Sequence, residues 1–226
     1  MTRNLGTRPG RFLLLRRAVA VMALLLAAGC AGSPPVAYYT LVSSAPATPN
    51  AAGAADEALV EVVPVTVPAQ VDQPQMMLRD SSGVVSPLYS QRWTAPLGDE
   101  VRAAVADRLT RELGIMDVNA VKPARGQPVW RVQIDVQRFD SIDGEAAVLD
   151  ATWRLRGINM RAPGALCRTQ VRVPVDAPGT VALVRAHQTA MHILSRRIAD
   201  RISGQQSVAM DGVTDICRAI AVDQDA

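Results

Sequence analysis

The sequence contains few of the side chains that most often bind metal ions or act in catalysis. Its 226 residues include two histidines and three cysteines, and aromatic residues make up 4% of the chain. His187 and His192 are five residues apart on an expected helix, so they do not share one face as metal ligands at i and i+4 would. His187 falls on the apolar stripe of that helix and is expected to be a satisfied core histidine. We therefore expect no metal site and no cofactor.

Motifs of the common hydrolases and phosphate-binding enzymes are also missing. The sequence contains no Gly-x-Ser-x-Gly, Ser-x-x-Lys or His-Glu-x-x-His motif and no phosphate-binding glycine loop. Carboxylates at Asp135, Asp140, Asp143 and Asp150 are interpreted as a solvated strand face and a hairpin turn. We expect a protein that is not an enzyme and that works through its surfaces.

No apolar run of the sequence is long enough to cross a bilayer. Residues 18–28 are apolar, whereas a spanning helix needs roughly 20 such residues. This run follows Arg16 and Arg17 and precedes Gly29 and Cys30, an arrangement typical of a secretory signal peptide. A cysteine directly after the small residues indicates a bacterial lipoprotein signal; twin-arginine export is the alternative. We expect residues 1–29 to be removed and the thiol of Cys30 to be lipidated.

The residue after this cysteine bears on the target membrane. It is Ala31 and not aspartate, so the usual signal for retention in the inner membrane is missing. We therefore expect the protein to be lipid-anchored in the outer membrane and to face the periplasm. A lipoprotein cysteine carries several acyl chains, and several chains give stable anchoring where one does not.

Acidic residues are absent from residues 1–29, which hold five arginines. Without this segment, 19 basic residues remain against 21 acidic ones, so the formal net charge changes from +3 to −2. The basic balance belongs to the signal peptide, and the mature chain gives no argument for binding nucleic acid.

Two further cysteines remain after Cys30. Cys167 lies on the apolar parity of an expected strand, and Cys217 lies near the C-terminus. In an oxidising compartment, two otherwise unexplained cysteines are candidates for a disulfide. The alternative is two buried free thiols that behave as small hydrophobic side chains.

The hydrophobic pattern predicts an α/β fold: a two-layer sandwich with a mainly antiparallel sheet covered by two long helices. The expected helices span residues 94–113, capped by Thr94, and 180–203. Phe139 changes the alternation parity of its strand, which indicates a bulge or a strand end, and Asp143-Gly144 indicates a hairpin. The expected strands cover residues 59–67, 75–79, 84–89, 116–121, 130–139, 147–156 and 167–175.

The expected domain organisation has four parts. Residues 1–29 are the signal peptide, 30–57 a lipidated tether, 58–204 the folded domain and 205–226 a C-terminal tail held only through Cys217. Fully extended, the tether would reach roughly 90 Å. Within it, the β-prone residues 38–41 are expected to dock as an edge strand or to bind a partner.

Several segments, in this order, resemble the PqiC (YmbA) family of ABC-type transport auxiliary lipoproteins. The resemblance covers residues 38–203. The segments that carry it are Tyr38-Tyr39-Thr40-Leu41, Asp72-Gln73-Pro74-Gln75-Met76-Met77-Leu78-Arg79, Arg92-Trp93-Thr94-Ala95-Pro96-Leu97, Arg131-Val132-Gln133-Ile134-Asp135-Val136 and Ala186-His187-Gln188.

The resemblance implies an outer-membrane lipoprotein that docks an MCE-domain transport protein. It also implies intermembrane lipid transport, envelope integrity as the biological role, and a possible homo-oligomer. Tyr38, Tyr39 and Trp93 are candidate partner-binding anchors, because aromatic residues are enriched at interfaces; a core position is the equal alternative for Trp93. A periplasmic lipid or solute carrier, and an auxiliary lipoprotein of another ABC export system, remain the alternative functions.

Overall fold

The computed structural model describes residues 35–44, 58–80 and 82–220. By its contacts the chain separates into a segment that ends at Pro35 and a compact unit that begins at Val36. The following description concerns this compact unit. Cys30, the expected lipidation site, lies outside the described residues.

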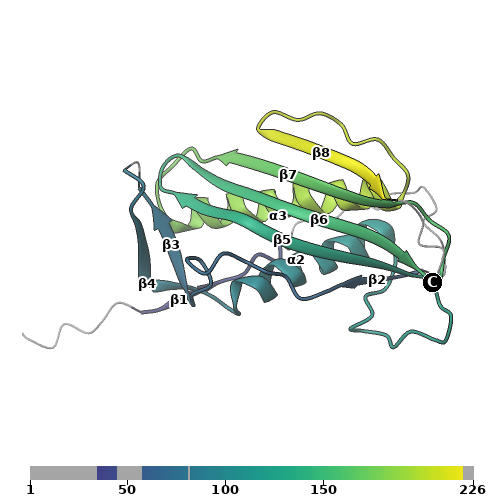
Figure 1. The fold of residues 1–226 in the computed structure, drawn as a ribbon. Helices are drawn as coiled ribbons and strands as arrows, with labels where there is room; N and C mark the ends of the chain where they lie inside the picture. Colours follow the sequence, from purple (N-terminus) through teal and green to yellow (C-terminus); the bar gives the residue numbers. More distant parts are fainter. Residues whose placement is uncertain (1–34, 45–57, 81, 221–226) are drawn as a thin grey trace, which may run out of the picture. The chain divides into compact units, whose positions relative to one another are not determined.

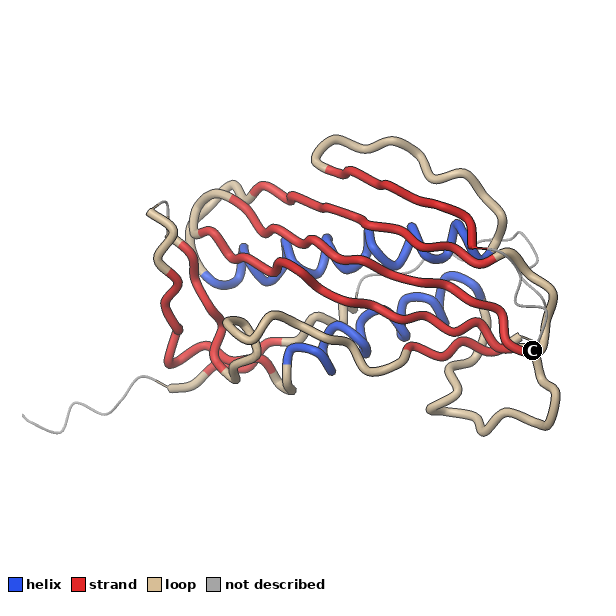
Figure 2. The backbone as a smooth tube through the Cα atoms, in the orientation of Figure 1, coloured by secondary structure: helices blue, strands red, loops and turns tan. Residues whose placement is uncertain are grey.

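One eight-stranded sheet forms the first layer of the fold, and two helices cover one of its faces (Figures 1 and 2). This arrangement confirms the predicted two-layer α/β sandwich. The strands are β1 (Ala37–Tyr39), β2 (Leu59–Val62), β3 (Gln75–Arg79), β4 (Val85–Trp93), β5 (Val129–Ile142), β6 (Ala146–Ile158), β7 (Gly164–Pro174) and β8 (Val213–Ile220).

The sheet has the order β1-β4-β3-β5-β6-β7-β8, and β2 pairs separately with β5. Its neighbours β3–β4, β5–β6, β6–β7 and β7–β8 are antiparallel, whereas β1–β4, β2–β5 and β3–β5 are parallel. The sheet is therefore mixed, with its antiparallel part in the long strands. β2 and β3 pair with opposite ends of β5, because Val60 lies opposite Trp130 and Arg79 lies opposite Ile142.

The long strands form where apolar and polar side chains alternate. Val132, Ile134 and Val136 of β5 are buried against the helices, while Arg131 and Gln133 between them are exposed. The pairing with β6 shifts register between Val136 and Arg138, as the change of parity at Phe139 predicted. The β5–β6 hairpin turns at residues 143–145, and Gly144 adopts a φ of 66°, which favours glycine.

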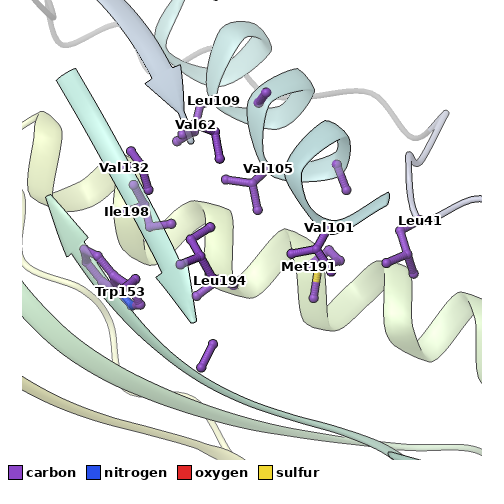
Figure 3. Packing of buried hydrophobic residues seen from close by; sticks show 14 of the residues in the cluster. Leu41, Val62, Val101, Val105, Leu109, Val132, Trp153, Met191, Leu194 and Ile198 are labelled. Carbon is purple, nitrogen blue, oxygen red and sulfur yellow. The ribbon is translucent and has the colours of Figure 1, made fainter. Parts of the chain in front are cut away.

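The helices α2 (Leu97–Leu113) and α3 (Thr180–Ile202) bury their apolar stripes on the sheet and on each other. Figure 3 shows Val101, Val105 and Leu109 of α2 facing Met191, Leu194 and Ile198 of α3. Gly114, in the left-handed conformation with φ 69°, ends α2. The predicted cap at Thr94 is wrong: α2 begins at Leu97, after Pro96, and no side chain caps it.

Three further expectations need correction, two for strands and one for the C-terminal tail. Residues 116–121 form no strand beyond an isolated bridge at Asp117, whose carboxylate accepts hydrogen bonds from the backbone and side-chain amides of Asn119, at 2.9 and 2.8 Å, in a turn. The strand expected over 59–67 ends at Val62, shortly before Pro64. The C-terminal tail is not held only through Cys217, because β8 pairs with β7 along its whole length.

Candidate docking site

The segment that follows the expected anchor is part of the folded domain. β1 pairs in parallel with the end of β4, where Tyr39 lies opposite Trp93. The backbone amide of Thr94 donates a 2.9 Å hydrogen bond to the Tyr39 carbonyl. Leu41, two residues after the strand, is 1% exposed and belongs to the core that α2 and α3 share (Figure 3). Of the two expectations for residues 38–41, the structure shows the docked strand.

A buried carboxylate on α2 holds this segment. Glu100 is 3% exposed, and its Oε2 accepts a 2.8 Å hydrogen bond from the Thr40 hydroxyl and a 2.7 Å hydrogen bond from the Leu41 amide. Its other oxygen, Oε1, accepts a hydrogen bond from the Thr94 hydroxyl. Glu100 also lies in the first turn of α2, where the helix dipole favours a negative charge. Hydrogen bonds to charged groups are among the stronger ones in proteins.

The second helix and the end of the first complete the attachment. Gln188 of α3 donates from Nε2 to the Thr40 carbonyl at 2.9 Å, and Arg111 of α2 donates from Nη2 to the Ser43 carbonyl at 2.8 Å. We call residues 37–43, with Glu100, Arg111 and Gln188, the N-terminal latch. Sequence analysis missed these three partners, which lie 59 to 148 positions from the segment they bind.

The three candidate aromatic anchors lie in different environments. Tyr38 is 61% exposed, whereas Tyr39 is half-buried and packs against the core. Trp93 is 5% exposed, with its ring edge-on to Phe139 and His187 at centroid distances of 6.0 and 6.2 Å. The structure thus places Trp93 in the interior, the alternative to a partner-binding role. Tyr38 alone of the three presents most of its side chain to solvent.

His187 is a core histidine, as predicted, but of its two ring nitrogens Nδ1 is buried without a hydrogen-bond partner among the described residues. Its ring stacks on Phe139 at 4.0 Å with an interplanar angle of 7°, and its Nε2 lies 2.8 Å from the Ser141 hydroxyl oxygen. Complete burial lowers the pKa of His187 to about 3, although the negative charge of Asp140 opposes the shift. The imidazole is therefore neutral at physiological pH. Because the side chain has no solvent exposure, it cannot reach a substrate in this conformation.

The opposite edge of the sheet is attached by different chemistry. Cys167 of β7 and Cys217 of β8 lie opposite each other, with Cα atoms 4.1 Å apart, and form a disulfide. Asp215 of β8 accepts a 2.7 Å hydrogen bond from the Thr169 hydroxyl and pairs with Arg197 of α3 at 2.8 Å. Arg197 is 5% exposed, so this ion pair supplies a counter-charge to a buried cation. Most other side chains of β8 are exposed, including Ile216.

The outer face of the long strands is polar and largely paired within the chain. Arg168 of β7 donates to both carboxylate oxygens of Asp150 on β6, at 2.9 and 2.6 Å. The hydrogen bonds from Arg168 lower the pKa of Asp150, although partial burial opposes the shift. Arg172 pairs with Glu145, and Arg131 pairs with Glu61 at 2.6 Å. The sequence interpretation as a solvated face and a hairpin turn agrees with the positions of Asp135 and Asp143, but it is wrong for Asp140 and Asp150, which are 4% and 7% exposed.

Buried side chains of the sheet and both helices form one hydrophobic core. Within the described residues, the hollow among the core residues Val71, Trp93 and Phe139 has a volume of about 10 Å³. Larger hollows of about 340 to 490 Å³ lie where charged side chains such as Lys122, Arg111 and Arg138 line them. Sites for drug-sized apolar ligands are typically concave and mostly apolar. These hollows are open to solvent and have charged residues in their walls, so they do not form an enclosed apolar cavity.

Across residues 35–44, 58–80 and 82–220, no three histidine, cysteine, aspartate or glutamate side chains gather in a way that would hold a metal ion. In the same residues, neither helix combines the length and the apolar character that a membrane span requires.

Comparison with known proteins agrees with the fold and identifies the family. No curated protein matches the chain. A crystal structure of an uncharacterised protein matches with a TM-score of 0.57 and 17% identity, covering 75% of this chain and 99% of that one. A DUF330 protein from Xanthomonas campestris matches with a TM-score of 0.54 and 18% identity, covering 75% and 96%. At these identities the similarity shows the fold alone.

The family model of the ABC-type transport auxiliary lipoprotein component matches residues 39–199. The match begins in β1 and ends in α3, so it includes the segment of the N-terminal latch from Tyr39 onward and all three of its side-chain partners. A lipoprotein component of a transport system is anchored to a membrane and faces the periplasm. The chain belongs to the family of ABC-type transport auxiliary lipoproteins.

Proposed function

We propose that this protein is anchored in the outer membrane through lipidated Cys30 and docks an MCE-domain transport protein in the periplasm. In this role it supports intermembrane lipid transport and envelope integrity without performing catalysis. Membership in the auxiliary lipoprotein family supports the transport role, and the signal sequence before Cys30 supports the anchor.

The hydrophobic core that the sheet and helices share is the observation that favours a docking protein over a lipid carrier. A carrier must enclose acyl chains, and the hollow among Val71, Trp93 and Phe139 in the described core is about 10 Å³. Binding sites for ligands of drug size have volumes of roughly 300 to 1,000 Å³ and are mostly apolar. The domain therefore offers surfaces to a partner.

The anchor is tested by the location and mass of the mature protein. The wild-type protein should begin at Cys30, carry acyl chains and fractionate with the outer membrane. Cys30→Ala should abolish the acyl mass and move the protein out of that fraction, whereas Ala31→Ser, one position later, should leave both unchanged. A wild-type protein that begins at Met1, or that carries no acyl chains, would contradict the proposal.

The partner is tested by crosslinking in the intact envelope, followed by purification of the protein under denaturing conditions. We expect an MCE-domain protein among the crosslinked products of the wild type and its loss with Cys30→Ala. Components of lipopolysaccharide export or efflux would indicate another auxiliary system. A stoichiometric lipid that remains with the natively purified domain would indicate a carrier and contradict the docking role.

A further inference from the structure

The geometry of the N-terminal latch points to a second contact surface, for the membrane itself. Resting on the proposed lipidation of Cys30, we propose that the end of the domain formed by β1 and the β3–β4 hairpin lies against the headgroups of the leaflet that holds the acyl chains. Tyr38 and Tyr89 are its principal contacts. This assigns Tyr38 to a lipid surface instead of a protein partner.

Only a short length of chain lies between the expected anchor and the first docked residue. The expected tether of residues 30–57 would have allowed a reach of roughly 90 Å. The latch fixes Ala37 onto β4, so this strand begins seven residues after Cys30. Seven residues span at most about 25 Å when fully extended. The β1 end of the domain is therefore confined to the vicinity of the leaflet.

The end of the domain formed by β1 and the β3–β4 hairpin exposes tyrosine and apolar side chains. Tyr89 of β4 is 72% exposed and lies two residues before Gln91, the partner of Ala37 in β1. Other large apolar side chains are exposed in the hairpin turn, before β1 and at the start of α3. These are Val84, Val36 and Val181. Tyrosine is enriched at the level of lipid headgroups, because its ring is apolar and its hydroxyl group remains hydrated.

The other end of the domain, near Met116 and the start of β5, lies far from this one. Met116 is 49% exposed, and its carbonyl accepts a hydrogen bond from Val60, which pairs with Trp130 near the start of β5. β3 pairs with Ile142 at the other end of that strand. Twelve residues of strand correspond to about 40 Å. Figure 1 shows β1, β3 and β4 at one end of the sheet and β2 toward the other.

The test measures how close each end lies to lipid in the full-length acylated protein. Tyr89→Cys and Met116→Cys each add one free thiol, since Cys167 and Cys217 are joined and Cys30 carries lipid. A fluorophore on that thiol is then quenched by headgroup-labelled lipid in phosphatidylethanolamine–phosphatidylglycerol vesicles. We expect quenching several-fold stronger at position 89 than at position 116. Equal quenching, or stronger quenching at 116, would overturn the inference.

A second pair of proteins tests the tyrosines themselves. With the fluorophore at Val84→Cys, the combined changes Tyr38→Ser and Tyr89→Ser should reduce quenching severalfold, because the serine side chains contribute no apolar surface. Unchanged quenching, or a crosslink from position 89 to a protein in the intact envelope, would overturn the assignment to lipid. Acyl mass is measured first: its absence would overturn the proposed function as well, whereas an acylated protein with the wrong pattern overturns this inference alone.

Discussion

β1 and β8 occupy the two ends of the strand order, and the protein attaches them in opposite ways. The chain around β1 is held by buried groups: Leu41 enters the core, and the carboxylate of Glu100 receives hydrogen bonds from Thr40 and Leu41. β8 buries few side chains and is joined to β7 by a disulfide. At β1 the buried carboxylate lies on a helix. At β8 it lies on the strand, because Asp215 pairs with Arg197 of α3.

This difference has a functional meaning. The β1 end bears the connection to the expected lipid anchor, and its attachment uses the same buried side chains that build the core. It therefore depends on no covalent bond beyond the backbone. The β8 edge carries a disulfide in addition to its ladder with β7, which suits a periplasmic protein. Three sets of variants and one change of pH test this difference between the two edges.

Removal of the disulfide should have the largest effect. The bridge joins positions 50 residues apart, and its loss should lower the free energy of unfolding by about 4 kcal/mol on the chain-entropy estimate. Urea denaturation of Cys167→Ala/Cys217→Ala, compared with the oxidised wild type, measures this. Ile216→Ser, an exposed change on the same strand, should be nearly neutral. Equal stability with and without the bridge would show that β8 is held without it.

Neutralising Asp215 should have the next largest effect. Asp215→Asn leaves Arg197 buried without its counter-charge, and breaking such a pair costs about 3 kcal/mol. Hydrogen exchange should show loss of protection in β8 before β1. Replacing exposed Asp211, which lies just before β8, by asparagine is the matched control and should leave exchange unchanged.

Neutralising Glu100 should weaken the other edge. Glu100→Gln retains the size of the side chain but replaces one acceptor oxygen by an amide, beside donors from Thr40, Leu41 and Thr94. We expect a loss of about 2 kcal/mol, with exchange rising first over residues 38–43. Asp99→Asn, at the exposed neighbouring position, is the control. Faster exchange in β8 than in residues 38–43 would contradict the account.

Lowering the pH should change the free energy of unfolding least, when the change is counted per pH unit. The pKa of His187 lies at about 3 in the folded protein, below the ordinary value of 6.5, so the unfolded chain binds more protons between these values. Stability from this group is complete above pH 6.5 and declines by about 1.4 kcal/mol per pH unit as the pH falls toward 3. His187→Phe should flatten this slope in urea denaturation at pH 4 to 7. An unchanged slope would show that other groups cause it.

Much of the fold could be predicted because its signals are local. Alternation in β5, β6 and β7 and the apolar stripe of α2 each report a face buried on the core. β8 was missed because its side chains are mostly exposed on both faces, so burial imposes no alternation on its sequence. The strand predicted over residues 116–121 is wrong because local β-propensity does not decide the conformation there. These residues lie in a turn that the Asp117 carboxylate stabilises.

The candidate site was less predictable. Tyr38 was noted for its aromatic character, but the latch depends on Glu100 and Gln188, which resemble ordinary helix residues in sequence. A glutamate in the first turn already has a local explanation in the helix dipole. The hydrogen bond that Glu100 accepts from Leu41, 59 residues away, produces no repeating pattern in the sequence. The same distance effect hides the environment of Trp93, which sequence analysis left between core and interface.

The central claim is that the folded domain begins at the latch, within seven residues of the expected anchor. The most direct measurement is native-state hydrogen exchange of the Leu41 amide, which donates to Glu100 at 2.7 Å. The account predicts that this amide is protected nearly as strongly as the amides of β5 in the wild type, and that Glu100→Gln removes much of that protection. Exchange of Leu41 at the rate of an unstructured peptide in the wild type would contradict it.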